Sequence, residues 1–223
     1  ICSKLGRLFP DDGILSEELP GPRVSRNGLR WIVDPIDGTT NFKNGCSDFA
    51  VSLAVAHRSA ISLGLVYAPY GGDLFLAEAG RGAEYRNVLW RETSRIKVSR
   101  TATLEQAVIE FCAAHERKAD ADRELRLIGR LYPGIRLRMT ESASLALCKV
   151  ACGQIDAYFQ PNERPYDYAA GALVAREAGG RVTSVLRNRL WLGRTGILAS
   201  NGLLHGALMA RIAGIYHERE RAG

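Results

Sequence analysis

The 223-residue sequence has no hydrophobic run that approaches the length of a membrane span. Such a helix needs about 20 consecutive apolar residues, and no charged-then-apolar segment of the signal-peptide type opens the chain. Contact with a membrane is therefore not expected, and a cytoplasmic location follows by default. Internal repeats, low-complexity tracts and long linkers are also absent. A single domain over residues 1–223 is expected.

Cysteine spacings of the kind found in disulfide frameworks or zinc sites are missing as well. The five cysteines form an odd, scattered set without a Cys-x-x-Cys pair, so they are expected to be reduced thiols. Cys148 and Cys152 are four residues apart, a spacing that also suits a metal. Their neighbours include Leu147 and Val150, and free cysteine behaves as a small hydrophobic residue. We therefore expect this segment to be a buried helix.

The charge balance favours anionic partners without identifying them. The formal net charge is +6 and the sequence pI is about 9.2, which suits either a phosphorylated metabolite or nucleic acid. The basic residues are spread along the chain, and no Lys/Arg block alternates with aromatic residues. The pattern therefore does not favour nucleic acid as a partner.

The hydrophobic pattern changes after Ala102, from short strands in an antiparallel meander to alternating strands and helices. Strands first and alternating elements second predict α/β layers with mixed sheets. The first part is expected to contain a helix that ends before the Pro10–Gly13 turn, and then the strands Ile14–Glu17, Arg30–Asp34, Phe49–Ala56, Ile61–Ala68 and Asp73–Ala79. The second part is expected to contain the strands Val108–Ala113, Ile135–Met139, Ile155–Phe159, Arg181–Val185 and Gly196–Ser200, and the helices Glu116–Leu131, Ser142–Cys152, Asp167–Ala178 and Leu203–Ile215.

The densest chemical signal is the string WIVDPIDGTTNF, residues 31–42. An apolar strand runs into Asp34 and is predicted to end at Pro35, which has no backbone N–H and a fixed φ. Asp37 follows three residues after Asp34, so the turn can bring both carboxylates and the Ile36 carbonyl to one point. Hard oxygen ligands of this kind suit Mg²⁺.

The residues that follow suit a phosphate. If Thr39 begins a helical turn, the free N–H groups of Gly38 and Thr39 face the same point and can bind an anion. The alternative is an ordinary loop, because Asp-Pro and Asp-Gly pairs are common in turns.

Two further acidic elements are ambiguous by themselves. Glu17 lies in SEEL, residues 16–19, and adjacent glutamates usually form a solvated face. Asp167 opens a helix rich in small residues, where an aspartate is most often a plain N-cap.

Several of these strings together resemble the inositol monophosphatase family. DPIDGTTNF, residues 34–42, resembles the first signature of the family, and YDYAAGALVAREAGG, residues 166–180, resembles the second, which usually has Trp before its Asp. ESASLALCKVACGQIDAYF, residues 141–159, and GILASNGLLHGAL, residues 196–208, are similar to its central helix and strand and to its last strand and helix. The resemblance extends from about Phe9 to about Ile212.

The resemblance implies an αβαβα sandwich of the type shared with fructose-1,6-bisphosphatase. Residues 1–102 would form the metal- and phosphate-binding half with the antiparallel sheet, and residues 103–223 the α/β half. The implied activity is Mg²⁺-dependent hydrolysis of a small phosphate monoester, such as inositol monophosphate or a related sugar phosphate, by a metal-activated water. The family is commonly dimeric and many members are inhibited by Li⁺, so a homodimer and lithium sensitivity are expected.

The resemblance also implies roles for individual residues. The expected ligands of two Mg²⁺ ions, with room for a third, are Glu17, Asp34, Ile36 through its carbonyl, Asp37 and Asp167. Gly38 and Thr39 correspond to backbone phosphate contacts, and the Thr39 hydroxyl to the group that orients the attacking water. Substrate contacts are expected at Gly38, Thr39, Ser142, Ala143, Gln160 and Asp167.

Some positions depart from the family pattern. Gln160 stands where inositol-selective members tend to have an acidic residue, which argues against selectivity for myo-inositol. Glu141 replaces a small Gly and is expected to narrow the pocket. Arg164 is expected to be a surface residue, with a substrate or subunit contact as the alternative. The basic segment Arg187–Arg194 is expected to be a surface loop.

The start of the sequence is the largest departure. Family members usually have two helices before the Glu-Glu element, with an aspartate that hydrogen-bonds the catalytic Thr, and this sequence begins too late to include them. Either an upstream segment exists or Thr39 lacks its partner, which would cost about 10² to 10⁴ in rate. This motivates an alternative hypothesis of a weakly catalytic, phosphate- or RNA-binding regulatory scaffold. An Asp-nucleophile phosphatase is disfavoured, because its two aspartates are separated by one residue and here Pro35 and Ile36 intervene.

Overall fold

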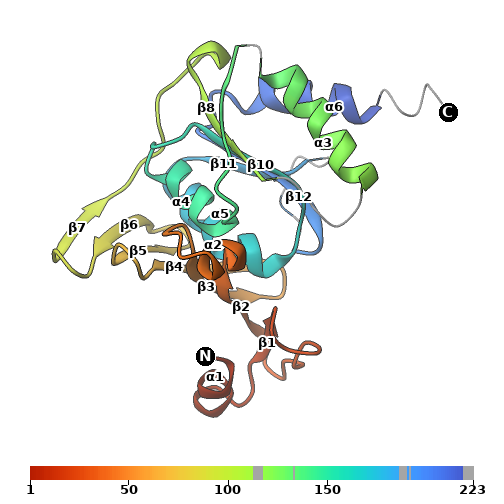
Figure 1. The fold of residues 1–223 in the computed structure, drawn as a ribbon. Helices are drawn as coiled ribbons and strands as arrows, with labels where there is room; N and C mark the ends of the chain where they lie inside the picture. Colours follow the sequence, from red (N-terminus) through yellow and green to blue (C-terminus); the bar gives the residue numbers. More distant parts are fainter. Residues whose placement is uncertain (113–117, 133, 186–189, 191, 218–223) are drawn as a thin grey trace.

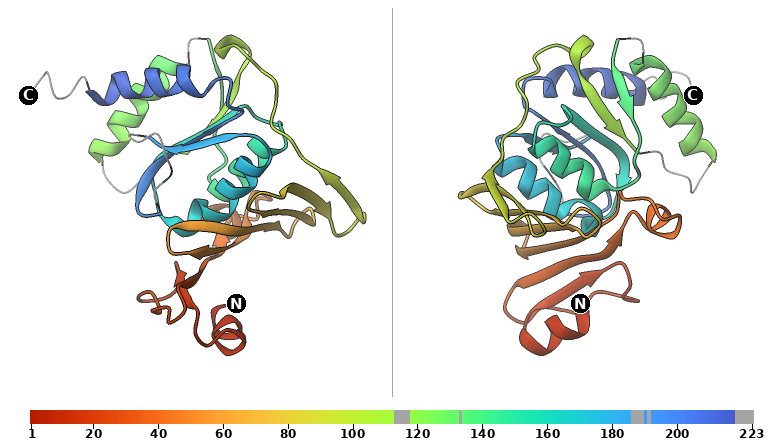
Figure 2. Two further views of the ribbon diagram at one scale, coloured as in Figure 1. Left: turned by 180° about the vertical axis from the view of Figure 1, so that it is seen from behind. Right: turned by 60° about the vertical axis from the view of Figure 1, so that its left-hand side comes forward.

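The computed structural model describes residues 1–112, 118–132, 134–185, 190 and 192–217. Two β-sheets are separated by a pair of helices, and a second pair covers the far face of one sheet (Figures 1 and 2). The short helix α1 (Cys2–Leu8) lies at the opposite end of the molecule from that second pair. This is the layered α/β arrangement that the alternation of elements predicts.

The first sheet has the strand order β1-β2-β3-β4-β5-β6-β7, so that neighbours in the sequence are neighbours in the sheet. Its first strand is parallel to the second, and every other pair is antiparallel, so the expected meander is correct from β2 onwards. The last two strands were not predicted. The bounds are β1 (Gly13–Ser16), β2 (Leu29–Asp37), β3 (Ala50–His57), β4 (Ala60–Ala68), β5 (Asp73–Glu78), β6 (Gly82–Asn87) and β7 (Glu92–Arg95).

The prediction that Pro35 ends its strand is wrong, because β2 continues to Asp37. The register against β3 pairs Asp34 with Ser52 and then Asp37 with Ala50, so β2 has one more residue than its partner in this stretch. Proline is tolerated at such a β-bulge, because the extra residue does not need to donate to the ladder. The bulge lies directly before the Gly-Thr-Thr turn and bends the strand there.

The second sheet has the order β11-β12-β10-β8-β9. The pairs β8/β9 and β8/β10 are parallel, and β12 runs antiparallel to both of its neighbours, so the sheet is mixed as expected. The bounds are β8 (Val108–Phe111), β9 (Arg136–Arg138), β10 (Ala157–Glu163), β11 (Arg181–Ser184) and β12 (Thr195–Ser200), with a short 3₁₀ turn at Leu104–Gln106 before β8.

The helices α4 (Ala143–Ala151) and α5 (Pro165–Glu177) pack side by side between the two sheets (Figure 1). Small residues in α5 and in the neighbouring strand β4 allow close contact. A Cβ atom on Gly171 would lie 2.7 Å from the Cβ of Leu147, and one on Gly64 would lie 2.7 Å from the carbonyl oxygen of Ala170. Cys148 is fully buried in this layer, as expected, and all five cysteines are free.

The helices α3 (Lys118–Leu131) and α6 (His205–His217) cover the other face of the second sheet. A second hydrophobic core lies under them and includes Leu127, Phe159 and Leu208. The five-residue helix α2 (Thr39–Lys43) follows β2. Among the described residues, no helix is both long and apolar enough to cross a bilayer.

Candidate active site

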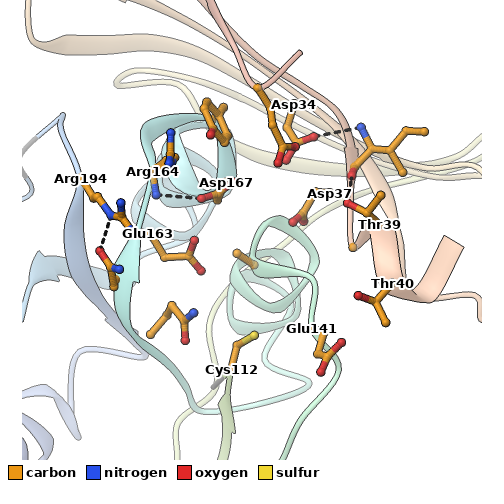
Figure 3. Close-up of a pocket in the computed structure, with 17 residues that line it drawn as sticks. Asp34, Asp37, Thr39, Thr40, Cys112, Glu141, Glu163, Arg164, Asp167 and Arg194 are labelled. Carbon is orange, nitrogen blue, oxygen red and sulfur yellow. Dashed lines mark hydrogen bonds between the residues drawn. The ribbon is translucent and has the colours of Figure 1, made fainter. Parts of the chain in front are cut away.

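A cavity of about 330 Å³ opens where the β2 bulge, the start of α5 and the end of β10 meet (Figure 3). These segments are far apart in the sequence, and the layered fold brings their polar ends together. Six acidic residues line the cavity: Glu17, Asp34, Asp37, Glu141, Glu163 and Asp167. Four of these are the predicted metal ligands with carboxylate side chains. The structure thus gathers them in one place.

Asp34 lies close enough to three other acidic residues of the cavity to be affected by their charges. Its side chain is only 1% exposed, and its Oδ1 accepts a hydrogen bond of 3.0 Å from the backbone N–H of Ile36. Burial first, and then the charges of Glu18 and Asp37, raise the pKa of Glu17. Burial first, and then the charges of Asp37, Glu17 and Asp167, raise the pKa of Asp34 to about 9. A cation at this position would oppose that shift, because it favours the ionised carboxylate.

Asp37 ends β2 and is held by the N-terminus of α4. Its Oδ2 accepts hydrogen bonds from the Ser142 hydroxyl at 2.6 Å, from the Ser144 backbone N–H at 2.9 Å and from the Ser144 hydroxyl. Burial raises the pKa of Asp37, and these hydrogen bonds oppose the rise because they favour the ionised form. The helix start therefore fixes the direction of this carboxylate.

Asp167 lies in the first turn of α5 but is not its N-cap. The helix begins at Pro165 with Arg164 as the N-cap, and Oδ2 of Asp167 accepts a 2.8 Å hydrogen bond from the Arg164 backbone N–H. The N-cap reading of Asp167 is therefore wrong, because the helix starts two residues earlier. Burial raises the pKa of Asp167 to about 6.

The Gly38–Thr39 turn takes the form that the sequence predicts. Gly38 has a φ of 86°, in the left-handed region, and a Cβ there would lie 2.7 Å from the carbonyl oxygen of Asp48. The position therefore requires glycine. Helix α2 starts at Thr39, whose hydroxyl donates to the Ile36 carbonyl at 3.4 Å, and the Phe42 N–H donates to the Gly38 carbonyl at 3.0 Å.

The predicted substrate contacts are distributed between the pocket wall and the layer behind it. Gly38, Thr39, Ala143 and Gln160 line the pocket. Ser142 is 1% exposed, and its hydroxyl is directed to Asp37 rather than into the cavity.

Sequence reasoning missed several residues of the opposite wall. Cys112, Asn162, Glu163 and Arg194 all line the cavity, and Arg194 belongs to the segment that was expected to be a surface loop. Residues 187–189 and 191 of that segment lie outside the described residues. Glu163 accepts a 2.9 Å hydrogen bond from the Tyr158 hydroxyl, and burial raises its pKa well above the ordinary value. The sequence signal that could have identified Glu163 is its position four residues before Asp167.

Similarity to known proteins identifies the family of this chain. The profile described as the inositol monophosphatase family matches residues 1–221. The chain belongs to the inositol monophosphatase family. The resemblance drawn from the signature strings is therefore confirmed.

Relatives and solved structures agree with that assignment. The chain is 34% identical over 202 residues to Nus factor SuhB of Vibrio cholerae, covering 90% of this chain and 73% of that protein. An IMPase from Thermotoga maritima superposes with a TM-score of 0.84 at 30% identity, over 97% of this chain and 80% of that one. The SuhB protein of Bartonella henselae gives 0.85 at 32% identity, over 95% and 80%. The predicted layered fold is thus that of solved members of the inositol monophosphatase family.

The name of the Vibrio relative is that of a factor rather than of a phosphatase. Nus factor SuhB of Escherichia coli K12 has the same name and is 30% identical over 213 residues, 95% of this chain and 78% of that protein. These names leave the catalytic activity of the relatives open. They also give no support to the expectation that nucleic acid is disfavoured as a partner.

The pocket residues fit the metal on which the inositol monophosphatase family generally depends, which is Mg²⁺. The donors are carboxylates and the Ile36 carbonyl, all hard oxygen atoms. The carboxylates raise one another's pKa, which a divalent cation would reverse. Within the described ranges, no three acidic, Cys or His side chains already stand in a cluster that could hold an ion.

Proposed function

We propose that the chain is a Mg²⁺-dependent phosphomonoesterase that hydrolyses a small sugar or polyol phosphate. The observation that carries the proposal is the meeting of Glu17, Asp34, Asp37 and Asp167 in one cavity beside the Gly38–Thr39 turn. The family assignment supports the proposal as well. Buried carboxylates that repel one another suit a site that binds cations, and a binding scaffold has no need for them.

The proposed metal ligands are supplied by three elements. Glu17, Asp34 and the Ile36 carbonyl would hold one Mg²⁺, and Asp34, Asp37 and Asp167 would hold a second. Two such ions balance the four carboxylate charges, which leaves room for a third ion to enter with a phosphate dianion. When bound, paired Mg²⁺ ions supply a lower pKa for a water and neutralise charge on the phosphoryl oxygens.

The protein groups position the reactants. The free N–H groups at the start of α2, those of Gly38 and Thr39, bind the phosphate oxygens. The hydroxyl of Thr39 orients the attacking water, and its contact with the Ile36 carbonyl holds it at the metal side of the turn. Ala143 and Gln160 face the alcohol portion. The water oxygen then forms a bond to phosphorus in line with the ester P–O bond that breaks. The attacking water loses a proton, the leaving alkoxide oxygen takes one up, and no protein nucleophile is required.

The experiment is a phosphate-release assay on a panel of inositol and sugar monophosphates, with and without Mg²⁺ and with Li⁺ added. We expect release that requires Mg²⁺, is inhibited by Li⁺ and is lost in Asp34→Asn, since this change removes a carboxylate proposed as a metal ligand. Ser62→Ala, a change in a side chain that only donates to the Val55 carbonyl, is a control that keeps the activity. Release that persists in EDTA would refute the metal mechanism.

A second candidate function is a regulatory scaffold that binds phosphate or RNA. The names of the Nus factor relatives and the net charge of +6 favour it. The scaffold predicts no release from any member of the panel, together with RNA binding that weakens as salt rises. The enzyme hypothesis instead predicts phosphate release that depends on the acidic residues of the pocket. A homodimer and a cytoplasmic location remain part of the proposal.

A further inference from the structure

Gln160, Asn162 and Arg194 form the part of the cavity here called the distal wall. They come from the end of β10 and from the residue before β12. In Figure 3, Arg194 lies on the other side of the cavity from Thr39 and Glu141. A phosphomonoester with its phosphate at the Thr39 turn would therefore direct its alcohol portion toward the distal wall.

A β-bulge shapes this wall. The register of β10 against β12 shifts between Gln160 and Glu163, where β10 has one more residue than its partner. The bulge approaches β12 closely, because a Cβ on Gly196 would lie 2.7 Å from the carbonyl oxygen of Pro161. Bulges next to active sites commonly re-aim side chains. Here the bulge contains Asn162 and lies between two pocket-lining residues.

Arg194 is held through its side chain and through the residue that precedes it. Its Nε donates a 2.8 Å hydrogen bond to Oδ1 of Asn162. The preceding residue, Gly193, donates its N–H to the Tyr168 hydroxyl at 3.1 Å, and that hydroxyl donates to the Gly193 carbonyl at 2.9 Å. Tyr168 is fully buried in α5 and follows Asp167 directly. The position of Arg194 is therefore tied to the helix that carries a proposed metal ligand.

Gln160 adds an unsatisfied polar group to the same wall. Its side chain is 6% exposed, and its Oε1 has no hydrogen-bond partner among the described residues. Buried polar atoms are nearly always hydrogen-bonded, so this unpaired oxygen indicates that a bound ligand supplies the donor. A substrate hydroxyl supplies such a donor and can accept from the amide NH₂ in return.

We infer that the distal wall binds a second anionic group, a carboxylate or a phosphate, on the alcohol portion of the substrate. This inference rests on the proposed phosphomonoesterase activity. The guanidinium of Arg194 is a planar fork that matches the paired oxygens of either group. Gln160 binds a hydroxyl between the two anions, and the cavity volume of about 330 Å³ suits a ligand of the size of a sugar bisphosphate or phosphosugar acid.

The test compares substrates in pairs that differ by one anionic group. Sorbitol 6-phosphate is paired with 6-phosphogluconate, which has the same open chain, for the carboxylate arm, and fructose 1-phosphate with fructose 1,6-bisphosphate for the phosphate arm. We expect kcat/KM with Mg²⁺ to be about tenfold higher or more for the anionic member of at least one pair, as for a charge-assisted contact. The pair that shows the preference identifies the anion.

Variants then assign the preference to the distal wall. Arg194→Gln should reduce the ratio within the preferred pair to near unity, and Arg194→Lys should retain part of it, because the charge stays while the fork is lost. Asn162→Ala should lower the ratio in the same direction by a smaller factor. Arg211→Gln, on α6 behind the second sheet, is the matched control and should leave the ratio unchanged.

The outcomes separate this inference from the proposed function. Hydrolysis without preference in either pair, or a preference that Arg194→Gln leaves intact, overturns the second anion site while the phosphatase stands. If no substrate is hydrolysed, the proposed function fails, and calorimetric titration of the same pairs still decides the site. Tighter binding of the anionic member that Arg194→Gln abolishes supports it, and equal binding refutes it.

Discussion

The Ser142 hydroxyl donates a 2.6 Å hydrogen bond to Oδ2 of Asp37, and the two residues are 105 positions apart in the sequence. The backbone and side chain of Ser144 donate to the same oxygen. The start of α4 thus holds one carboxylate of the pocket from behind. Groups that orient a metal ligand in this way typically contribute about 10- to 100-fold to metal affinity.

We predict that the double change Ser142→Ala and Ser144→Ala lowers Mg²⁺ affinity about tenfold or more. The hydroxyls favour the ionised form of Asp37, so their loss raises the pKa of that carboxyl further and increases competition by protons. The measurement is calorimetric titration with Mg²⁺ at pH 6 and pH 8, where the loss should be greater at pH 6. Ser62→Ala is the control, and equal affinity in both variants would show that Asp37 does not bind the metal.

The metal-free protein should become less stable as the pH rises, through Asp34. The folded-state pKa of this carboxyl is raised to about 9. Between its unfolded value near 4 and that value, the folded protein holds a proton that the unfolded chain has lost. The free energy of unfolding therefore falls with rising pH across this window. Burial lowers the pKa of His205 to about 4. This residue acts in the opposite sense at low pH, because the free energy of unfolding rises with pH between that value and the unfolded value near 6.5.

A variant isolates the contribution of Asp34 from that of His205. In EDTA, Asp34→Asn should have a higher Tm than the unchanged protein, and the difference should grow from pH 5 to pH 8. Added Mg²⁺ should raise the Tm of the unchanged protein more at pH 8 than at pH 5, since metal and protons compete for the carboxylates. A Tm difference that is the same at both pH values would contradict the raised pKa.

Much of the fold follows from patterns that are local in the sequence. The helices α4 and α5 were predicted within a few residues, because runs of small and apolar residues such as those from Ala143 to Ala151 read as buried helix. The strands β6 and β7 were missed. They are polar, and β7, Glu92–Arg95, is exposed throughout, so no alternation marks it. The β2 strand was cut short at Pro35 because a bulge depends on the partner strand.

The candidate site likewise has one part that could be predicted from the sequence and one that could not. Asp34, Asp37 and the Gly38–Thr39 turn are adjacent in the sequence, so their shared role was readable from one string. The contact of Arg194 with Asn162 spans 32 positions and depends on the β10–β12 register and its bulge. Neither residue type nor spacing predicts that register, so the distal wall could be recognised only in the three-dimensional structure.

Glu141 is strained, because its φ of 56° places a non-glycine residue in the left-handed region. Such a conformation costs about 1 to 2 kcal/mol for a residue with a Cβ. We predict that Glu141→Gly is more stable than Glu141→Ala by about 1 kcal/mol. Both changes remove the carboxylate, so the comparison isolates the backbone. The measurement is the urea midpoint of the two variants, and identical midpoints would exclude the strain.

Gly171 lets α5 contact α4 closely, and its replacement should affect both stability and metal binding. A Cβ there would lie 2.7 Å from the Cβ of Leu147 and 3.0 Å from the carbonyl oxygen of Ser144. Overpacking of this kind typically costs about 1 to 3 kcal/mol, which exceeds the gain in helix propensity of about 1 kcal/mol for Gly to Ala. Gly171→Ala should therefore lower the free energy of unfolding.

The same change should weaken Mg²⁺ binding beyond its effect on stability. Ser144 on α4 holds Asp37 and Asp167 is on α5, so moving the helices apart separates two proposed ligands. Gly129→Ala in α3 is the matched control, because no atom lies within 4 Å of its Cβ, and it should be neutral or stabilising by up to about 1 kcal/mol. Urea unfolding and Mg²⁺ titration of both variants decide the matter. Unchanged Mg²⁺ affinity in a destabilised Gly171→Ala would show that the spacing of α4 and α5 does not set the ligand geometry.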